Sequence, residues 1–416
     1  MISSLASSML APFQVRSFRY QFPADLLTSW GIEMENLVLG WYILVETGSV
    51  LLLTLLWALQ YLGTLLAPII GMAGDRVGHR TVLCAMRAWY AVLATLMTSL
   101  ALAGSLRPSY ALVIAGLAGL VRPADWGMRN ALVGDTMPSD TLMATMGLSR
   151  TTADSARIAG SLAGAGLFAW LGLGAVYLTI ACCYGLGFLL TLGVARRRIG
   201  VVAPAGRALS LWRDFKEGLA YLWDTPASLA AMWLAFLVNL TAFPLTGALL
   251  PYVAKNIYHI DQTGLGTLIA SFALGSLIGS VVVSISGRLL RAARMMLVFA
   301  FGWYAMLLLF IAMPGPASAR IMLMLAGIAQ SLCMVPMSVM LLHGAGARFR
   351  GRVMGVRIMA IYGAPVGLLA AGFLIERVGF APTAQLYCLS GIALTALIAL
   401  RWRGALWPVD APANAR

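Results

Sequence analysis

The chain has 416 residues, of which 61% are hydrophobic and only 11% are charged, and its mean hydropathy is +0.87. Soluble domains carry about 25% charged residues, so this composition excludes a soluble protein and indicates an integral membrane protein. The net charge of +14 is compatible with a polyanionic partner such as nucleic acid, but the positions of the basic residues argue against one.

Twelve segments are long and apolar enough to be transmembrane helices, because a hydrocarbon core of about 30 Å needs about 20 apolar residues per helix. The runs do not alternate polar and apolar residues as barrel strands do. We therefore predict an all-α integral membrane protein with twelve transmembrane helices, at approximately 22–45, 49–72, 82–104, 109–134, 144–170, 174–195, 228–253, 263–287, 293–313, 318–342, 351–376 and 382–402.

Basic residues are concentrated in alternate connections and in both tails, while the opposite loops hold only Arg107, Lys255, Arg320 and Arg377. This asymmetry follows the positive-inside rule, by which loops rich in lysine and arginine lie in the cytoplasm. The excess of basic residues therefore indicates the orientation of the protein in the membrane, and we expect no nucleic-acid partner. We predict a multi-pass protein of the bacterial cytoplasmic (inner) membrane with both termini cytoplasmic. The first ten residues lack the basic region of a cleavable signal peptide.

The segments divide into two six-helix bundles, 1–199 and 228–416, joined by a linker at 200–227 that contains an amphipathic helix expected on the cytoplasmic face. The halves repeat: an ungapped register places Thr47-Gly48 opposite Thr263-Gly264, and Gly63 opposite Gly279. Many transporters consist of such repeats, with the substrate site between them near the middle of the membrane.

A charged, glycine-rich turn, Gly71 to Arg80, separates the second and third segments. It resembles the pattern G-x-x-x-D-R-x-G-R-R of the major facilitator superfamily of transporters, with His79 in place of a basic residue. The resemblance implies that Asp75 closes the cytoplasmic side against the start of the eleventh helix, near Gly351 to Gly355. We also expect Arg76 and Arg80 to pair with Asp135.

Helix five begins with a ladder of charges that can pair along one face, Arg150, Asp154 and Arg157. A stripe of small residues follows, including Gly160 and Gly164, and is similar to a proton antiporter motif without its proline. Such a stripe also suits close helix packing in any membrane bundle. The predicted conformational gate comprises Gly71, Asp75, Arg76, Gly78, Arg80, Asp135, Asp154 and Arg157.

Three further stretches narrow the resemblance to one branch of the superfamily. They are 31–49 with Trp41, Arg129 to Pro138, and Gly351 to Gly355. They resemble the branch that contains enterobactin-type siderophore exporters and macrolide efflux proteins.

Ionisable side chains within spans are costly, so each indicates a functional site. Glu33 and Glu35 on helix one point to opposite faces, and Glu33 shares a stripe with Asn36 and other small or polar residues. We favour Glu33 as the group that carries the proton, although a permanent pair with an arginine is the alternative. The predicted proton-coupling residues are Glu33, Glu35, Arg122 and Asp125.

On helix four, Arg122, Asp125 and Arg129 fall on one face, so Asp125 can pair with either arginine. Arg122 can instead reach Glu33, which resembles drug/proton antiporters with an acid on helix one and an arginine on helix four. The spans of the second half are nearly free of charge. The predicted substrate-cavity residues are Asn36, Tyr42, Asn239, Gln330 and Tyr362.

The leading hypothesis is a secondary active transporter that exports amphipathic small molecules, drugs or siderophore-like compounds, by proton-coupled alternating access. The alternative is an importer on the same fold, since a fold does not set direction. A membrane-embedded enzyme is a remote alternative because no nucleophile, base and metal ligands converge. The five cysteines lack metal-ligand spacing, so we expect no bound metal. We also expect no cofactor, with the proton gradient as the energy source, and a monomer in the lipid bilayer.

Overall fold

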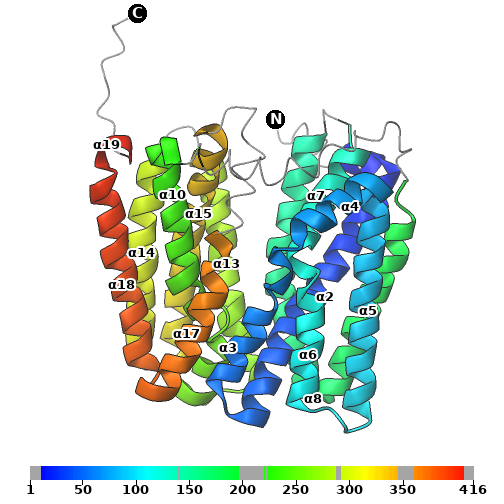
Figure 1. Ribbon diagram of the computed structural model, residues 1–416. Coiled ribbons are helices and arrows are strands. Elements are labelled where there is room, and N and C mark those ends of the chain that lie inside the picture. Colours follow the sequence, from blue (N-terminus) through cyan, green and yellow to red (C-terminus); the bar gives the residue numbers. More distant parts are fainter. Residues whose placement is uncertain are drawn as a thin grey trace, which may run out of the picture. The chain divides into compact units, whose positions relative to one another are not determined.

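The computed structural model describes residues 11–138, 141–195, 220, 223–286, 292–344 and 360–406. Within these ranges the secondary structure is entirely helical, and no strand occurs (Figure 1). The chain forms two compact units, Met1–Val202 with Leu250–Ala270, and Ala203–Leu249 with Ser271–Arg416. This division differs from the expected halves in residues 250–270. Most of the expected linker, 200–227, lies outside the described residues.

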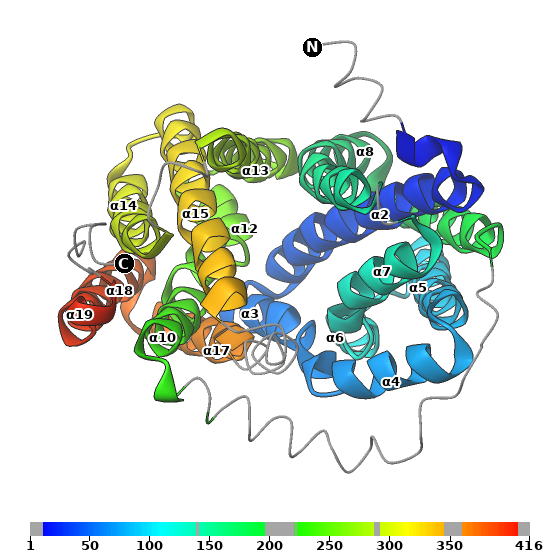
Figure 2. The ribbon, with the colours of Figure 1, turned by 90° about the horizontal axis from the view of Figure 1, so that it is seen from above.

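In the first unit, α2 packs against α8, and α8 also packs against α5. An apolar core containing Leu83, Met86, Met128 and Leu132 lies between α5 and α7. Figure 2 shows α2 crossing this unit beside α7 and α8. The helices of the unit are η1 (Ala11–Gln14), α2 (Arg16–Thr47), α3 (Val50–Leu59), η2 (Leu62–Thr64), α4 (Ala67–Val77), α5 (His79–Leu102), α6 (Pro108–Gly119), α7 (Arg122–Thr136), α8 (Leu142–Leu192), α12 (Leu250–Tyr252), η4 (Val253–Ile257) and the start of α13 (Gln262–Ser286).

In the second unit, α14 packs against α15 and α18, and α10 packs against α17 and α18. The large aromatic side chains of Trp303, Tyr304 and Phe310 on α14 are buried. The helices of the unit are α10 (Pro226–Thr241), α11 (Phe243–Thr246), the remainder of α13, α14 (Ala292–Ala312), α15 (Pro316–Gly344), α17 (Gly363–Val378), α18 (Phe380–Arg401) and α19 (Arg403–Leu406).

Among the described residues, seven helices are long and apolar enough to cross a membrane, or eight if the bent pair Val50–Thr64 and Ala67–Val77 is one span. α8 covers the fifth and sixth expected segments, which meet at Gly172, where φ is 76°. The first, seventh and eleventh expected segments are helical in α2, α10 and α17. α2 carries several ionisable residues, which lowers its hydropathy.

Gly172 has a backbone conformation that residues with side chains rarely adopt, and the chain reverses there. Both parts of α8 consequently pack against the same stretch of α2. Gly160, before the break, lies against the backbone of Trp30, and Tyr184, after it, lies against Gly31. This reversal brings residues from both expected spans to the polar side chains of α2.

The two units contain the same close helix crossing. A β-carbon at Gly160 would lie 3.2 Å from the carbonyl oxygen of Trp30, and one at Gly164 would lie 3.0 Å from Met34 Cα. In the second unit, Gly363 and Gly367 meet the carbonyl oxygens of Phe236 and Leu240 at the same four-residue spacing on both helices. Small residues allow such a close approach of two backbones, so α10 with α17 repeats the packing of α2 with α8.

A second crossing is repeated in the register predicted from the sequence. Gly63 meets the carbonyl oxygen of Leu120, and Gly279 meets that of Ile328. Gly119 and Gly327, one residue earlier on α6 and α15, complete the two crossings. The matched contacts give a residue-by-residue correspondence between the two units.

Candidate functional site

Arg122, the first residue of α7, is the centre of a polar cluster in the first unit. Its Nη2 donates to Glu35 Oε2 at 2.5 Å, and its Nη1 donates to Gln60 Oε1 at 2.7 Å and to Asn36 Oδ1 at 3.1 Å. Tyr184 donates its hydroxyl hydrogen to the same Glu35 oxygen at 2.8 Å. We call these five residues the Arg122 cluster. They come from α2, the end of α3, α7 and α8.

The aromatic ring of Tyr90 covers the guanidinium of Arg122, with 6.0 Å between Cζ and the ring centroid. Tyr90 and Tyr184 are themselves in contact, with ring centroids 5.5 Å apart. The ion pair thus lies beside two aromatic rings and is largely buried, with 13% of the Arg122 side chain and 5% of the Glu35 side chain accessible. An ion pair in such a setting is strong, and separating its members is costly.

Glu33 does not pair with Arg122 in this structure; that contact was one of the pairings that the sequence left open. Glu33 lies on the side of α2 that packs against α8, where its Cβ would meet a β-carbon at Gly160 at 3.0 Å. Its carboxyl is half-buried and is affected electrostatically by Arg157 and Arg122. Among the described residues, Glu33 has no hydrogen-bond or ion-pair partner. The reason is geometric: Glu33 and Glu35 point to different faces, and Arg122 lies on the face of Glu35.

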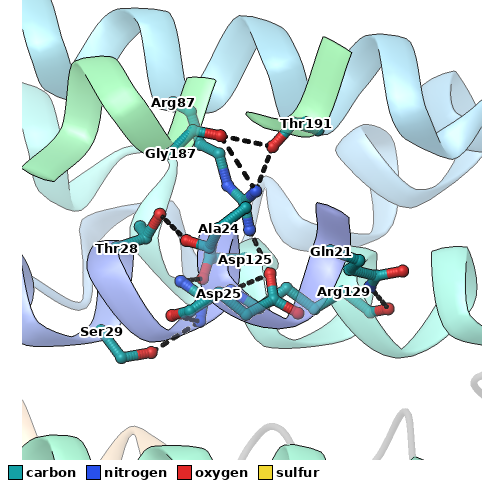
Figure 3. A network of polar contacts seen from close by, with 10 residues as sticks. All are labelled: Gln21, Ala24, Asp25, Thr28, Ser29, Arg87, Asp125, Arg129, Gly187 and Thr191. Atoms are coloured by element: carbon teal, nitrogen blue, oxygen red, sulfur yellow. Dashed lines mark hydrogen bonds and ion pairs between the residues drawn. The ribbon is translucent and has the colours of Figure 1, made fainter. Parts of the chain in front are cut away.

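A second buried network joins α2, α5 and α7 and consists of Asp25, Arg87, Arg129 and Asp125 (Figure 3). The Asp25 carboxylate accepts a hydrogen bond from Arg87 Nη2 and lies 3.8 Å from Arg129 Nε. Arg129 Nη2 lies 2.6 Å from Asp125 Oδ2. We call these four residues the Asp25 network. Its formal charges cancel, which is what allows it to be buried.

Neighbouring hydroxyl and carbonyl groups accept further hydrogen bonds from the two arginines. Arg87 donates to the Thr191 hydroxyl and to the Gly187 carbonyl of α8, while Arg129 donates to the Ser29 hydroxyl at 2.7 Å. Gln21 donates to the Arg129 carbonyl at 3.1 Å. The network therefore connects four helices of the unit and includes the second part of α8.

Helical spacing allows Asp125 to pair with either Arg122 or Arg129, and in the structure it pairs with Arg129. Asp25 and Arg87 were missed as site residues. Both lie within expected transmembrane segments, so the rule that ionisable residues in spans indicate functional sites would have found them.

The charged turn between α4 and α5 is built differently from the expected gate. His79, not Arg76 or Arg80, contacts Asp135: His79 Nδ1 lies 2.7 Å from Asp135 Oδ2, and His79 Nε2 lies 3.4 Å from Asp75 Oδ1. Arg80 donates instead to the carbonyl oxygens of Thr191 and Leu192 at the end of α8. The residue by which the turn departs from the superfamily pattern thus forms its central bridge.

Two glycines shape this turn. Gly78 separates α4 from α5 with φ 92°, and Gly71 lies on α4 one turn before Asp75.

Asp75 and Arg76 are exposed, and Asp75 keeps 66% of its side-chain surface accessible. The predicted partner of Asp75, Gly351 to Gly355, lies outside the described residues. Asp154 and Arg157 are half-buried on α8 and both take part in further interactions.

The repeated crossings identify the counterparts of these charges in the second unit. Met34 and Leu240 are matched by their glycine contacts, so the residues before them, Glu33 and Asn239, correspond. Leu120 and Ile328 are matched in the same way, so Arg122 and Gln330, two residues later, correspond. Thr241 corresponds to Glu35, and its hydroxyl lies 2.6 Å from that of Tyr304. Neutral polar side chains thus occupy the positions that carry charge in the first unit.

Three of the predicted cavity residues are half-buried on their helices, namely Asn239, Gln330 and Tyr362. Asn239 donates to the Ala235 carbonyl at 2.8 Å. Tyr42 is buried near the end of α2 and donates to the Leu106 carbonyl at 3.1 Å. No group of three or more metal-ligating side chains was found among the described residues.

The fold is that of an all-helical protein, within the described ranges, whose long apolar helices are suited to crossing a membrane. The family model of the Major Facilitator Superfamily matches residues 22–365, so the chain belongs to this superfamily. No curated protein matches the sequence.

Several solved structures share the fold at low sequence identity. A bacterial homologue of the human lysosomal transporter Spinster, in an inward-facing and unoccupied conformation, has a TM-score of 0.69 at 13% identity and covers 93% of this chain and 96% of its own. A D-xylose–proton symporter has a TM-score of 0.70 at 11% identity, with coverages of 91% and 95%. The human organic anion transporter MFSD10 has a TM-score of 0.63 at 14% identity, with coverages of 92% and 98%.

Proposed function

We propose that this protein is a proton-coupled secondary transporter that exports amphipathic small molecules by alternating access. The observation that carries the proposal is the asymmetry of charge between the repeated units. The first unit carries Glu33, Glu35 and Arg122 at positions where the second carries Asn239, Thr241 and Gln330. Buried carboxyl groups are suited to proton transfer, and neutral polar groups are suited to hydrogen bonding with a substrate.

In the proposed mechanism, Glu33 is the carboxyl group that binds and releases the proton. It is half-buried and has no ion pair within the described ranges, whereas Glu35 is held by both Arg122 and Tyr184. Arg122 is the positive charge that responds to the protonation state of Glu33, and it pairs with Glu35 in the state described here. Protonation of Glu33 would release the cargo outward, and deprotonation from the cytoplasm would restore affinity for the next molecule.

The proposed cargo is an amphipathic or cationic small molecule, either a drug or a siderophore-like compound. This choice rests on the carboxyl of Glu33 in the first unit and on the neutral polar and apolar side chains of the second, since an apolar wall with few polar groups is the usual form of a small-molecule site. The resemblance of residues 31–49 and 129–138 to siderophore exporters and macrolide efflux proteins supports the same class.

Import is the second candidate, and the similarity to a D-xylose–proton symporter favours considering it. Direction can be decided in inverted membrane vesicles with an acidified interior. A proton-coupled exporter is expected to take up substrate from the medium under these conditions, because outward proton flow drives substrate inward. Loss of preloaded substrate under the same gradient would show a symporter and contradict export. A screen of substrates for pH-dependent export from cells, with and without the protein, would supply the test compound.

We propose that the turn from Gly71 to Arg80 is a cytoplasmic gate, with Asp75 as its latch. Replacing the exposed Asp75 by asparagine is expected to shift the resting population toward the inward-open state, with little effect on folding. The physical reason is that a carboxylate next to a helix N-terminus is stabilised by about 0.3–1 kcal/mol, which the amide loses. The measurement is the accessibility of engineered cysteines to a thiol reagent added from the cytoplasmic side.

Unchanged accessibility in this variant would exclude Asp75 as a latch. The matched control is Asp261→Asn, which removes an exposed carboxylate from the loop before α13, outside the turn.

We further propose that the protein is a monomer in the bacterial inner membrane with both termini in the cytoplasm. The two six-helix halves, 1–199 and 228–416, would be the moving bodies.

A further inference from the structure

An apolar groove lies in the second unit between α10 and α18 and is lined at the end of α18 by Trp402. Its volume is about 340 Å³, which is within the range of small-ligand sites. The side chains that define it are Trp233 and Phe236 on α10, Leu394 and Leu397 on α18, and Arg401 and Trp402 at the end of α18. None of these residues belongs to the Arg122 cluster or to the gate.

The walls of the groove face outward. Trp233 keeps 49% of its surface accessible, and Leu397 keeps 60%. Exposed apolar side chains on transmembrane helices are in contact with lipid chains, so the groove opens to the hydrocarbon region. An occupant must therefore present apolar groups to most of the groove.

One end of the groove carries a positive charge. Arg401 is exposed in the last turn of α18, and its Cζ lies 5.6 Å from the centroid of the Trp402 ring. No carboxylate pairs with Arg401 in the part of the chain that the structure describes. Arg403 follows on α19, which is anchored by the buried side chain of Leu406. An unpaired arginine beside tryptophan is typical of the level of lipid headgroups.

We infer that this groove is a binding site for an anionic phospholipid. One acyl chain lies along Trp233, Phe236 and Leu397, and the phosphate pairs with Arg401. The choice of occupant rests on charge complementarity between the groove and a lipid. Of the described residues that line the groove, Arg401 is the one that is charged, and it lies at the end of α18, where an anionic headgroup would lie above the acyl chains. Basic pockets between transmembrane helices on the cytoplasmic side bind anionic headgroups in this way. The inference does not rest on the proposed transport activity.

The test is titration of the purified full-length protein in detergent with phosphatidylglycerol or phosphatidylcholine of identical acyl chains, followed by native mass spectrometry. We expect a phosphatidylglycerol molecule that is retained preferentially. Arg401→Gln is expected to weaken its binding about fivefold, which corresponds to the attraction of one arginine for an anionic headgroup. Leu397→Trp, which fills the groove at an exposed position, is expected to weaken binding of either lipid.

Arg377→Gln is the matched control. Arg377 is also exposed in the last turn of its helix, and it also lies over an aromatic ring, 4.2 Å from the centroid of Phe373. It does not line the groove, so this variant should bind phosphatidylglycerol as the unmodified protein does. Equal retention of the two lipids, or equal effects of Arg401→Gln and Arg377→Gln, would overturn the inference. So would unchanged lipid binding in Leu397→Trp, which would mean that the groove holds a segment of the chain or another ligand.

Discussion

Replacing Glu33 by glutamine is expected to abolish proton-driven transport while leaving downhill exchange of substrate measurable. Glutamine has the shape of the protonated glutamic acid but cannot release a proton, so the carrier is fixed in one protonation state. Exchange without net proton movement does not require that step. The measurement is the pH dependence of substrate binding in detergent, together with transport driven by an imposed proton gradient.

Glu35→Gln is the matched comparison because it makes the same chemical change two residues away on α2. Its amide can still accept hydrogen bonds from Arg122 and Tyr184, so we expect the pH dependence of binding to persist in this variant. The result that would refute the assignment is a normal pH profile in Glu33→Gln with a flattened one in Glu35→Gln or Asp154→Asn. The coupling role would then belong to that other acid.

Asp25→Ala is expected to destabilise the first unit strongly, by about 3–5 kcal/mol, because it leaves two buried arginines facing a single remaining acid. Arg87 is fully buried and contacts the Asp25 carboxylate directly. Stability can be followed by thermal unfolding with a thiol-reactive dye, since Cys84 of this unit is buried and reacts only on unfolding, above the constant signal of the exposed Cys182.

A double variant tests whether charge balance is the cause. In Asp25→Leu with Arg87→Met, the remaining Arg129 and Asp125 form a neutral pair 2.6 Å apart, so the double variant should unfold at a higher temperature than Asp25→Leu alone. Asp75→Asn removes an exposed acid and should unfold like the unmodified protein. If the loss of stability in the double variant equals the sum of the losses in Asp25→Leu and Arg87→Met, the network does not act as a unit.

The sequence was sufficient to predict the class of fold. Long apolar runs permit few structures in a membrane, and each of the twelve expected segments contains helix within the described residues. The match to the Major Facilitator Superfamily confirms the family that was inferred from the turn at Gly71 to Arg80. The register that placed Gly63 opposite Gly279 also corresponds to equivalent backbone contacts in the two units.

The pairing of charges could not be predicted in the same way. Helical periodicity gives the face of a residue on its own helix, but the partner depends on the rotation of the neighbouring helix. Arg122 therefore reaches Glu35 instead of Glu33, although both acids were recognised as candidates. In the turn, His79 was noted only as a departure from the pattern, because its bridge to Asp135 depends on how α7 packs against α4 and α5.

The paired glycines that bring α2 to α8 and α10 to α17 have a consequence for how this chain can diversify. The backbone contacts recur in both units, while the side chains one position before Met34 and Leu240 differ, being Glu33 and Asn239. Side chains next to these contacts can therefore be exchanged without altering the backbone packing. A library that tests the proposed cargo contacts should randomise Asn239 and Gln330 and leave Gly363 and Gly367 fixed.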